Sequence, residues 1–265
     1  MNGARRLTAR LWRRLSRRAL TSYALWLAVL GPTVAAATTP VPCAEYTRPT
    51  QDYAHCVLGD CVEYRGLVVH EPDPKDIGGH LSFDIVLPDD HVFEDITPLC
   101  LHTTTPALLD GPPRYLVVET SMTQGGSLAL YGVEAGDLRK IAETVHIGQR
   151  NRWLAPIGAA DFDGDGRVEY AFVDRPHLAK TLRIVRQDGA RLVEIAALRG
   201  VTNHRIGEDF ITGGVRWCGE SPEMLTVDAR WQRIIATRFR DGQIAAQDIG
   251  PFRGQDSMRA ALSCE

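Results

Sequence analysis

The chain has 265 residues, of which 44% are hydrophobic and 24% are charged. This composition provides enough apolar surface for a buried core in one large domain or two small ones, and it excludes an intrinsically disordered chain. Seven of the 30 basic residues lie in the first 37 positions, which leaves 23 basic against 33 acidic residues in 38–265, a net charge of −10. A surface of that sign does not favour binding to nucleic acid or to an anionic membrane.

The first 37 residues are a predicted signal peptide. They contain seven arginines and no acid, and an uncharged run, ALTSYALWLAVLG, precedes the three alanines at 35–37. The segment SRRAL (16–20) resembles the twin-arginine export signal and favours that route, while general export stays open. A membrane anchor is the alternative, but the apolar run 19–30 is shorter than the ~20 residues of a spanning helix. We therefore expect a periplasmic or secreted protein that starts near Thr38, with no membrane span after signal removal.

Six cysteines follow the predicted signal peptide, at positions 43, 56, 61, 100, 218 and 264. An even number of cysteines in an exported chain predicts disulfide bonds, and six cysteines allow 15 pairings. Cys56 and Cys61 are close enough to close a local turn, and a bond from Cys218 to Cys264 would tie the last strands to the C-terminus. A zinc site is the alternative, but the chain lacks the Cys-x-x-Cys pair typical of one.

Short apolar runs recur along the chain with a spacing of about 54 residues. The segment GRVEYAFVD (166–174) aligns with GPPRYLVVE (111–119) at an offset of 55 and with ESPEMLTVD (220–228) at an offset of 54. Two further runs with period-two alternation follow each segment, and Asp-Gly pairs mark hairpin turns between some of them. Each unit is therefore predicted to be an antiparallel meander. The segments 91–99, 152–160 and 205–214 are predicted to supply a fourth strand to each unit.

Four strands in about 50 residues are the usual content of a propeller blade. We therefore predict an all-β fold, a small β-propeller of about four or five blades, which occupies residues 38–265 as a single domain. Residues 46–88 would form one more, divergent unit, and almost nothing indicates a long amphipathic helix. A β-sandwich with coincidental internal similarity is the alternative.

The stretch DFDGDGRVE, residues 161–169, holds four carboxylates and two glycines. Calcium takes six to eight oxygen ligands, and a short loop can supply them where acids alternate and glycine lets the backbone turn. The predicted ligands are the carboxylates of Asp161, Asp163, Asp165 and Glu169 and the carbonyl oxygen of Arg167. A solvated acidic turn without an ion is the alternative. Magnesium fits less well than calcium because it is usually bound through fewer carboxylates and keeps its waters.

The pattern D-x-D-x-D-G-x-x-E, followed directly by a strand, resembles the FG-GAP or integrin-type calcium loop. The loop is not an EF-hand, because an EF-hand has a glutamate at its twelfth position, where this chain has Phe172. FG-GAP loops occur in β-propellers and in exported bacterial proteins described as VCBS repeat-containing, so the resemblance implies a propeller that binds calcium.

The corresponding segments of the other two units lack these acids. Pro106 and Leu108 take the positions of Asp161 and Asp163 in the first unit, and Trp217 and Gly219 take ligand positions in the third. The sequence therefore predicts one calcium site. In the first unit Arg114 takes the position of Glu169, and we expect its guanidinium to pair with Asp110 in place of a cation.

Two further segments, DRPH (174–177) and TNHRIGED (202–209), gather polar side chains in loops between predicted strands, where binding sites are often found. The candidate ligand-binding residues are Asp174, Arg175, His177, Asn203, His204 and Arg205. They would bind a polar ligand such as a sugar or a carboxylate. In the alternative they are turn residues, with Arg205 paired to Glu208 or Asp209 and His204 bound to the backbone.

No sequence motif indicates a catalytic nucleophile, since the chain has neither a Gly-x-Ser-x-Gly segment nor a phosphate-binding glycine loop. We therefore predict no catalytic residues and a calcium-dependent module that binds a protein or carbohydrate ligand. The alternative is a hydrolase or other enzyme that acts on a polar substrate, such as a carbohydrate, through His177, His204 and Arg205.

Overall fold

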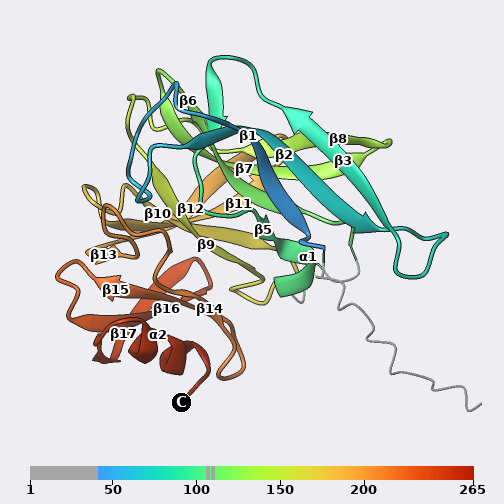
Figure 1. Cartoon of the computed structure of the whole chain (residues 1–265). Helices are drawn as coiled ribbons and strands as arrows, with labels where there is room; N and C mark the ends of the chain where they lie inside the picture. Colours follow the sequence, from blue (N-terminus) through green and yellow to red (C-terminus); the bar gives the residue numbers. More distant parts are fainter. Residues whose placement is uncertain (1–40, 106–107, 109–110) are drawn as a thin grey trace, which may run out of the picture. The chain divides into compact units, whose positions relative to one another are not determined.

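The computed structural model describes residues 41–105, 108 and 111–265 (Figure 1). The predicted signal peptide, and Asp110 with its expected partnership with Arg114, lie outside the described residues. The described chain forms seventeen strands and two short helices, which is the all-β fold predicted from the sequence. Neither of these helices is long and apolar enough to span a membrane.

The N-terminal strands form an antiparallel group of three. These strands are β1 (Ala44–Thr50), β2 (Glu63–Pro72) and β3 (His80–Val86). Strand β2 lies in the middle, because it pairs with β1 on one side and with β3 on the other. The side chains of Leu67 and Val69 on β2 are fully buried. Through them the three strands pack against the core of the first meander.

Three meanders follow. The first contains β4 (His91–Phe93), β5 (Leu99–Cys100), β6 (Tyr115–Ser121), β7 (Gly125–Glu134) and β8 (Asp137–Glu143), with helix α1 (Leu101–Thr104) after β5. The second contains β9 (Leu154–Ala160), β10 (Glu169–Asp174), β11 (Thr181–Asp188) and β12 (Arg191–Arg199). The third contains β13 (Val201–Thr202), β14 (Gly214–Arg216), β15 (Glu223–Asp228), β16 (Arg233–Arg240) and β17 (Gln243–Pro251), and helix α2 (Gln255–Leu262) follows it. The strands β6, β10 and β15 begin at residues 115, 169 and 223, which are 54 residues apart.

The first two meanders belong to one 12-stranded sheet, and the third forms a separate five-stranded sheet. A single parallel pair, Arg191 with Glu143, joins β12 to β8, so the large sheet consists of two antiparallel parts whose strands pair at one position. Apolar side chains of both parts pack in one core. Within the described residues the strand order runs from β1 at one edge to β9 at the other without closing into a ring. The number of propeller blades is therefore not given by the strand pairing.

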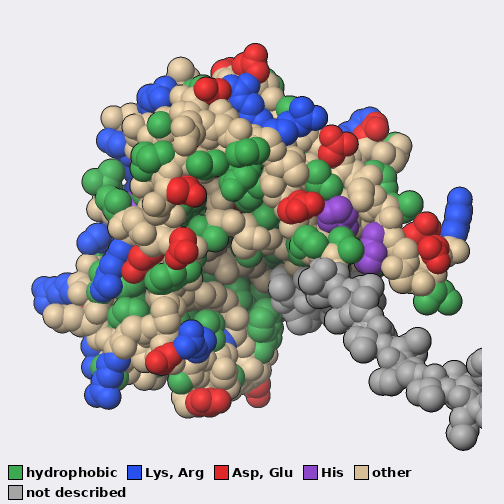
Figure 2. Space-filling model, in the orientation of Figure 1, with side chains coloured by type: hydrophobic (Ala, Val, Ile, Leu, Met, Phe, Trp, Pro, Cys, Tyr) green, Lys and Arg blue, Asp and Glu red, His purple; other side chains and the backbone are tan. Residues whose placement is uncertain are grey.

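The middle strands of the meanders carry the core. Every residue of β6 and of β10 is buried, and these strands are rich in valine, alanine and aromatic residues, as strands covered on both faces usually are. The outer strands β8, β12 and β17 alternate or are largely exposed. Figure 2 shows acidic and basic side chains interspersed over the face in view.

All six cysteines are paired, as Cys43–Cys100, Cys56–Cys61 and Cys218–Cys264. The second and third bonds were predicted from the sequence, and both are confirmed. The first joins the chain just before β1 to the end of β5, across 57 residues. Three disulfides indicate an oxidising compartment outside the cytoplasm.

Two local predictions were wrong, and one element was not anticipated. Residues 205–213 are a loop rather than a strand, and within this loop Gly207 and Gly213 take positive φ angles of 90° and 117°, outside the usual strand range. Of residues 91–99, only the two ends are strand. The eight-residue helix α2 was not expected; it buries Met258 and Ala261 against the last sheet, and tertiary contacts of this kind stabilise helices that are too short to form alone.

Candidate functional site

The acidic loop 161–169 connects β9 to β10 and is curled around its own carboxylates. Asp161 accepts hydrogen bonds from the N–H groups of Gly164 (2.7 Å) and Gly166 (2.9 Å). Both glycines have positive φ, 78° and 85°, a conformation in which a side chain would be strained. Asp165 accepts from the N–H of Arg167 at 2.8 Å. The glycines therefore let the backbone wrap so that the first acid is held inward.

Three of the predicted metal ligands converge. Oxygen atoms of Asp161, Asp163 and Glu169 all lie within 4.8 Å of one another. The carboxylate of Glu169 is fully buried at the start of β10 and accepts from the N–H of Phe162 at 2.8 Å. Burial raises the pKa of Glu169, while this N–H and the nearby Arg186 act in the opposite direction.

The guanidinium of Arg186 reaches into the loop from β11. Its Nη2 lies 2.9 Å from Asp163, its Nη1 lies 3.0 Å from Asp165, and its Nε lies 2.7 Å from Glu169. Sequence reasoning missed this residue. Its signal was the strand register, since Arg186 stands directly opposite Glu169 in the β10–β11 pair.

The other two predicted ligands are less central. Asp165 does not belong to the group of converging oxygens, and its side chain is 40% exposed. The side chain of Arg167 lies away from the loop, with Nη2 donating to the carbonyl of Gln187 at 3.4 Å.

The third meander places a similar glutamate at the same position without an acidic loop. Glu223, at the start of β15, is buried and lies 2.6 Å from Nε of Arg238 on β16. Arg216 on β14 binds it from the other side, at 2.6 Å. In the first meander Arg114 takes this place, and its nearest acid among the described residues is Glu134, at 3.9 Å.

The predicted ligand-binding residues fall into two groups. The first is an ion-pair chain in which Asp174 accepts from Arg175 at 2.7 Å and from Arg183 at 2.9 Å. Arg183 also pairs with Glu194. The two arginines lower the pKa of Asp174 despite its burial, so this carboxyl group is ionised.

The second group is a histidine pair. His177 Nε2 and His204 Nδ1 lie 2.9 Å apart, and His204 Nε2 lies 2.9 Å from the carbonyl oxygen of Glu208. The ring of Trp153 stacks against His177 and meets His204 edge-on. Burial lowers the pKa of both histidines, that of His177 to about 4, so both rings are neutral near pH 7.

Asn203 and Arg205 do not join the histidine pair. Asn203 is buried, and its amide donates to the carbonyl of Ala155 at 3.3 Å. Arg205 lies over the ring of Trp231, 4.1 Å from its centroid, and approaches Glu208 at 3.9 Å. The turn-residue interpretation therefore describes the contacts of Arg205 and the backbone contact of His204.

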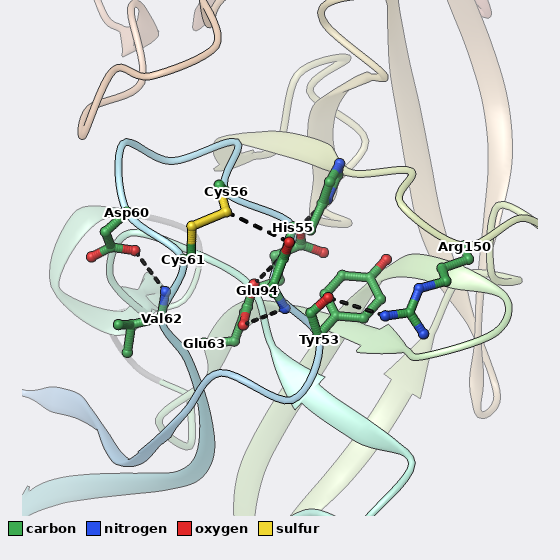
Figure 3. The surroundings of a disulfide bond; sticks show 10 residues. Tyr53, His55, Cys56, Asp60, Cys61, Val62, Glu63, Glu94 and Arg150 are labelled. Carbon is green, nitrogen blue, oxygen red and sulfur yellow. Dashed lines mark hydrogen bonds and ion pairs between the residues drawn. A yellow bond between two sulfur atoms is a disulfide. The ribbon is translucent and has the colours of Figure 1, made fainter.

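Sequence reasoning missed a third histidine, His55. It directly precedes the turn closed by Cys56–Cys61, and its Nδ1 forms a hydrogen bond with the buried carboxylate of Glu94 (Figure 3). A pocket of about 450 Å³ is lined by His55, Trp153, Arg175 and His177. These residues come from segments more than 90 positions apart, so no local pattern could have grouped them.

No protein-family model matches the chain, and a search of curated proteins finds no match either.

Proposed function

We propose that this protein is an exported calcium-binding β-propeller of the FG-GAP type, in which one calcium ion stabilises a non-catalytic module that binds a ligand or a protein partner. The observation that carries the proposal is the convergence of oxygens from Asp161, Asp163 and Glu169 within 4.8 Å.

The size of this group suits calcium. Calcium–oxygen distances are about 2.3 to 2.6 Å, so two ligands on opposite sides of one ion are at most about 5 Å apart. Each carboxylate oxygen has two lone pairs, and the hydrogen bonds that hold Asp161 and Glu169 in place leave lone pairs for a metal. The three residues are therefore spaced to hold one calcium ion, and the guanidinium of Arg186, which contacts Asp163 and Glu169, would compete with the ion for them.

The carboxylates of the loop are also incompletely neutralised by the protein. Four carboxylates lie within nine residues, and Arg186 is the one cation that contacts them among the described residues. The formal balance of these groups is −3. Carboxylates so close together repel one another unless a cation lies between them, and a divalent ion would remove most of that repulsion.

The propeller part of the proposal is supported by strand spacing. Three successive meanders place the corresponding buried strands β6, β10 and β15 54 residues apart. The strands of the first two meanders pair at one position, as expected for neighbouring blades that are not one continuous ladder, while their apolar side chains share one core. The N-terminal group β1–β3 would be the fourth blade.

A calcium titration followed by thermal unfolding tests the proposal. We expect calcium to raise the unfolding midpoint of the protein and EDTA to lower it, and Asp163→Asn to abolish the difference. Asp188→Asn is a matched control, since Asp188 is an exposed acid at the end of β11 outside the loop. No calcium effect in the unmodified protein would leave the loop as a solvated turn.

An enzyme that acts on a polar substrate is the second candidate. The contact between His177 and His204 beside a pocket favours it. Arg205, the third residue of that hypothesis, is directed to Trp231 instead. Any catalytic version of the site would therefore need a different partner for the histidines.

A further inference from the structure

The pocket beside Trp153 has the size of a small-molecule site. Its volume is about 450 Å³, within the range of about 300 to 1,000 Å³ usual for ligand pockets. Its walls combine apolar side chains from Val57, Leu178 and Ile206 with two histidines and two arginines, and no acid among the described residues lines it. In a chain with more acidic than basic residues, a pocket whose charged lining is basic selects for an anionic ligand.

The orientation of His55 is fixed from three sides. Its backbone N–H donates to Glu63 at 2.9 Å, and the adjacent disulfide Cys56–Cys61 closes the turn (Figure 3). Its Nδ1 bonds to Glu94, whose other oxygen accepts from the hydroxyl of Thr120 at 2.8 Å. Burial raises the pKa of Glu94, while its bonds to His55 and Thr120 act in the opposite direction. With Glu94 accepting at both oxygens, Nδ1 carries the hydrogen. The lone pair of Nε2, for which the described residues provide no partner, is therefore presented to the pocket.

The histidine pair fixes a second lone pair in the same pocket. A carbonyl oxygen only accepts, so His204 Nε2 carries the hydrogen that binds Glu208. Because His204 is neutral, its Nδ1 is an acceptor, and the hydrogen between the two rings belongs to His177 Nε2. His177 Nδ1 then has a lone pair without a partner among the described residues, and His177 lines the pocket.

Arg175 supplies the positive charge. Its Nε and Nη2 bind Asp174 at 2.7 and 3.0 Å, which leaves Nη1 to donate elsewhere. Asp174 is shared with Arg183, so it does not neutralise Arg175 completely. The carboxylates of Glu63 and Glu94 are engaged on the far side of His55, away from its Nε2.

The backbone around the pocket is strained. Nine non-glycine residues of the described chain have positive φ, and three of them line this pocket: Ala54 (51°), Asn151 (54°) and Arg175 (44°). Such conformations are unfavourable for residues with a side chain and gather at functional sites. Tyr53 fixes two of the three segments together, since its hydroxyl accepts from the N–H of Asn151 at 2.7 Å.

We propose that this pocket binds a small hydroxylated carboxylate, the chemical class of the sugar acids, with its carboxylate on Arg175 and its hydroxyls donating to His55 Nε2 and His177 Nδ1. The proposal deepens the ligand-binding part of the proposed function, because it assigns a site and a ligand class to the module. It does not depend on calcium in the acidic loop.

Carbethoxylation of histidines by diethyl pyrocarbonate, mapped by peptide mass spectrometry, tests the site in the calcium-supplemented protein. His55 is compared with His80, which is exposed on β3. Since Glu94 makes Nε2 a better nucleophile, we expect His55 to react faster than His80. D-glucuronate at about ten times its dissociation constant should slow His55 about tenfold, as expected for ~90% occupancy, and should leave His80 unchanged.

Two control ligands, each lacking one of the proposed recognition groups, and two arginine variants test the specificity of this protection. D-glucose lacks the charge and acetate lacks the hydroxyls, so neither should protect His55 at the same millimolar concentration. Arg175→Gln should abolish protection by D-glucuronate, whereas Arg199→Gln, at an exposed arginine on β12, should retain it. The proposal is overturned if His55 reacts no faster than His80, or if D-glucuronate protects no better than D-glucose and acetate. A missing calcium effect on the thermal midpoint would leave this result unchanged, so the two failures are distinguishable.

Discussion

The starts of β10 and β15 place a buried glutamate at the same point of two meanders, and the two glutamates differ in what neutralises them. Glu223 has two guanidinium partners, Arg216 and Arg238. Glu169 has one, Arg186, which it shares with Asp163 and Asp165. The formal balance is +1 around Glu223 and −3 in the acidic loop, counting Asp161.

The difference between the two sites distinguishes a shared glutamate–arginine pair from the additional acids of the 161–169 loop. The cross-strand pair of a glutamate with an arginine on the next strand occurs in the second and third meanders, whereas Arg114 takes the place of the glutamate in the first. The acids at 161, 163 and 165 are extra, and their charge is not balanced by the protein itself. The third meander instead has Trp217 and Gly219 in the corresponding segment, with Cys218 tied to Cys264. A disulfide thus fastens one loop, and a metal is proposed to fasten the other.

The largest effect is expected from Glu223→Gln. The substitution leaves Arg216, whose side chain is only 12% exposed, without a counter-charge, and breaking a buried ion pair costs about 3 kcal/mol or more. Denaturant unfolding should show this loss equally in calcium and in EDTA. A loss that depended on calcium would mean that the two glutamates do not play separate roles.

Glu169→Gln should give a calcium-dependent loss instead. In EDTA the effect should be small, because Arg186 retains Asp163 and Asp165 as partners. In calcium at about 100 times its dissociation constant, the variant should lack about 2.7 kcal/mol of stabilisation. The same unfolding experiment measures it. Equal losses in both conditions would show that Glu169, like Glu223, serves only its arginine.

Asp95 shows a third way to neutralise a buried acid. It is 5% exposed, its Oδ2 has no hydrogen-bond partner, and burial raises its pKa to about 8. The folded protein therefore retains a proton on Asp95 that the unfolded chain loses near pH 4. The stability that this bound proton provides is complete below pH 4 and is lost as the pH rises to 8. Asp95→Asn should remove up to about 1.4 kcal/mol per pH unit of that decline. Unfolding curves between pH 5 and 8, an interval set by the raised pKa, check it, and an unchanged slope in the variant would contradict it.

The smallest effect is expected at Arg186, whose guanidinium would compete with calcium for the carboxylates of the loop. Arg186→Gln removes a positive charge from the metal ligands, so calcium affinity should rise, by about tenfold or less for a charge a few ångströms away in a partly solvated site. Arg238→Gln, its counterpart in the third meander, should not change calcium affinity. Isothermal titration calorimetry of the two variants checks this, and weaker binding in Arg186→Gln would show that the guanidinium helps to hold the site.

The class of the fold and the position of the acidic loop could be predicted from the sequence. Period-two alternation and hairpin turns are local signals, and they located the strands from β6 to β12 and from β15 to β17 within a few residues. The spacing of Cys56 and Cys61, and the alternation of acids and glycines at 161–169, are equally local. These features depend on neighbours in the chain, which is why they could be read without the structure.

Which charged side chains meet depends on the tertiary structure. Arg186 joins Glu169 because of strand register, and Arg216 joins Glu223 because β14 pairs with β15. His55, Glu94, Trp153 and His177 meet at one pocket although they span residues 55 to 177. Their meeting depends on how the N-terminal strands pack beside the second meander. Long-range packing of this kind leaves no periodic signal in the sequence, because each residue is placed by a different segment.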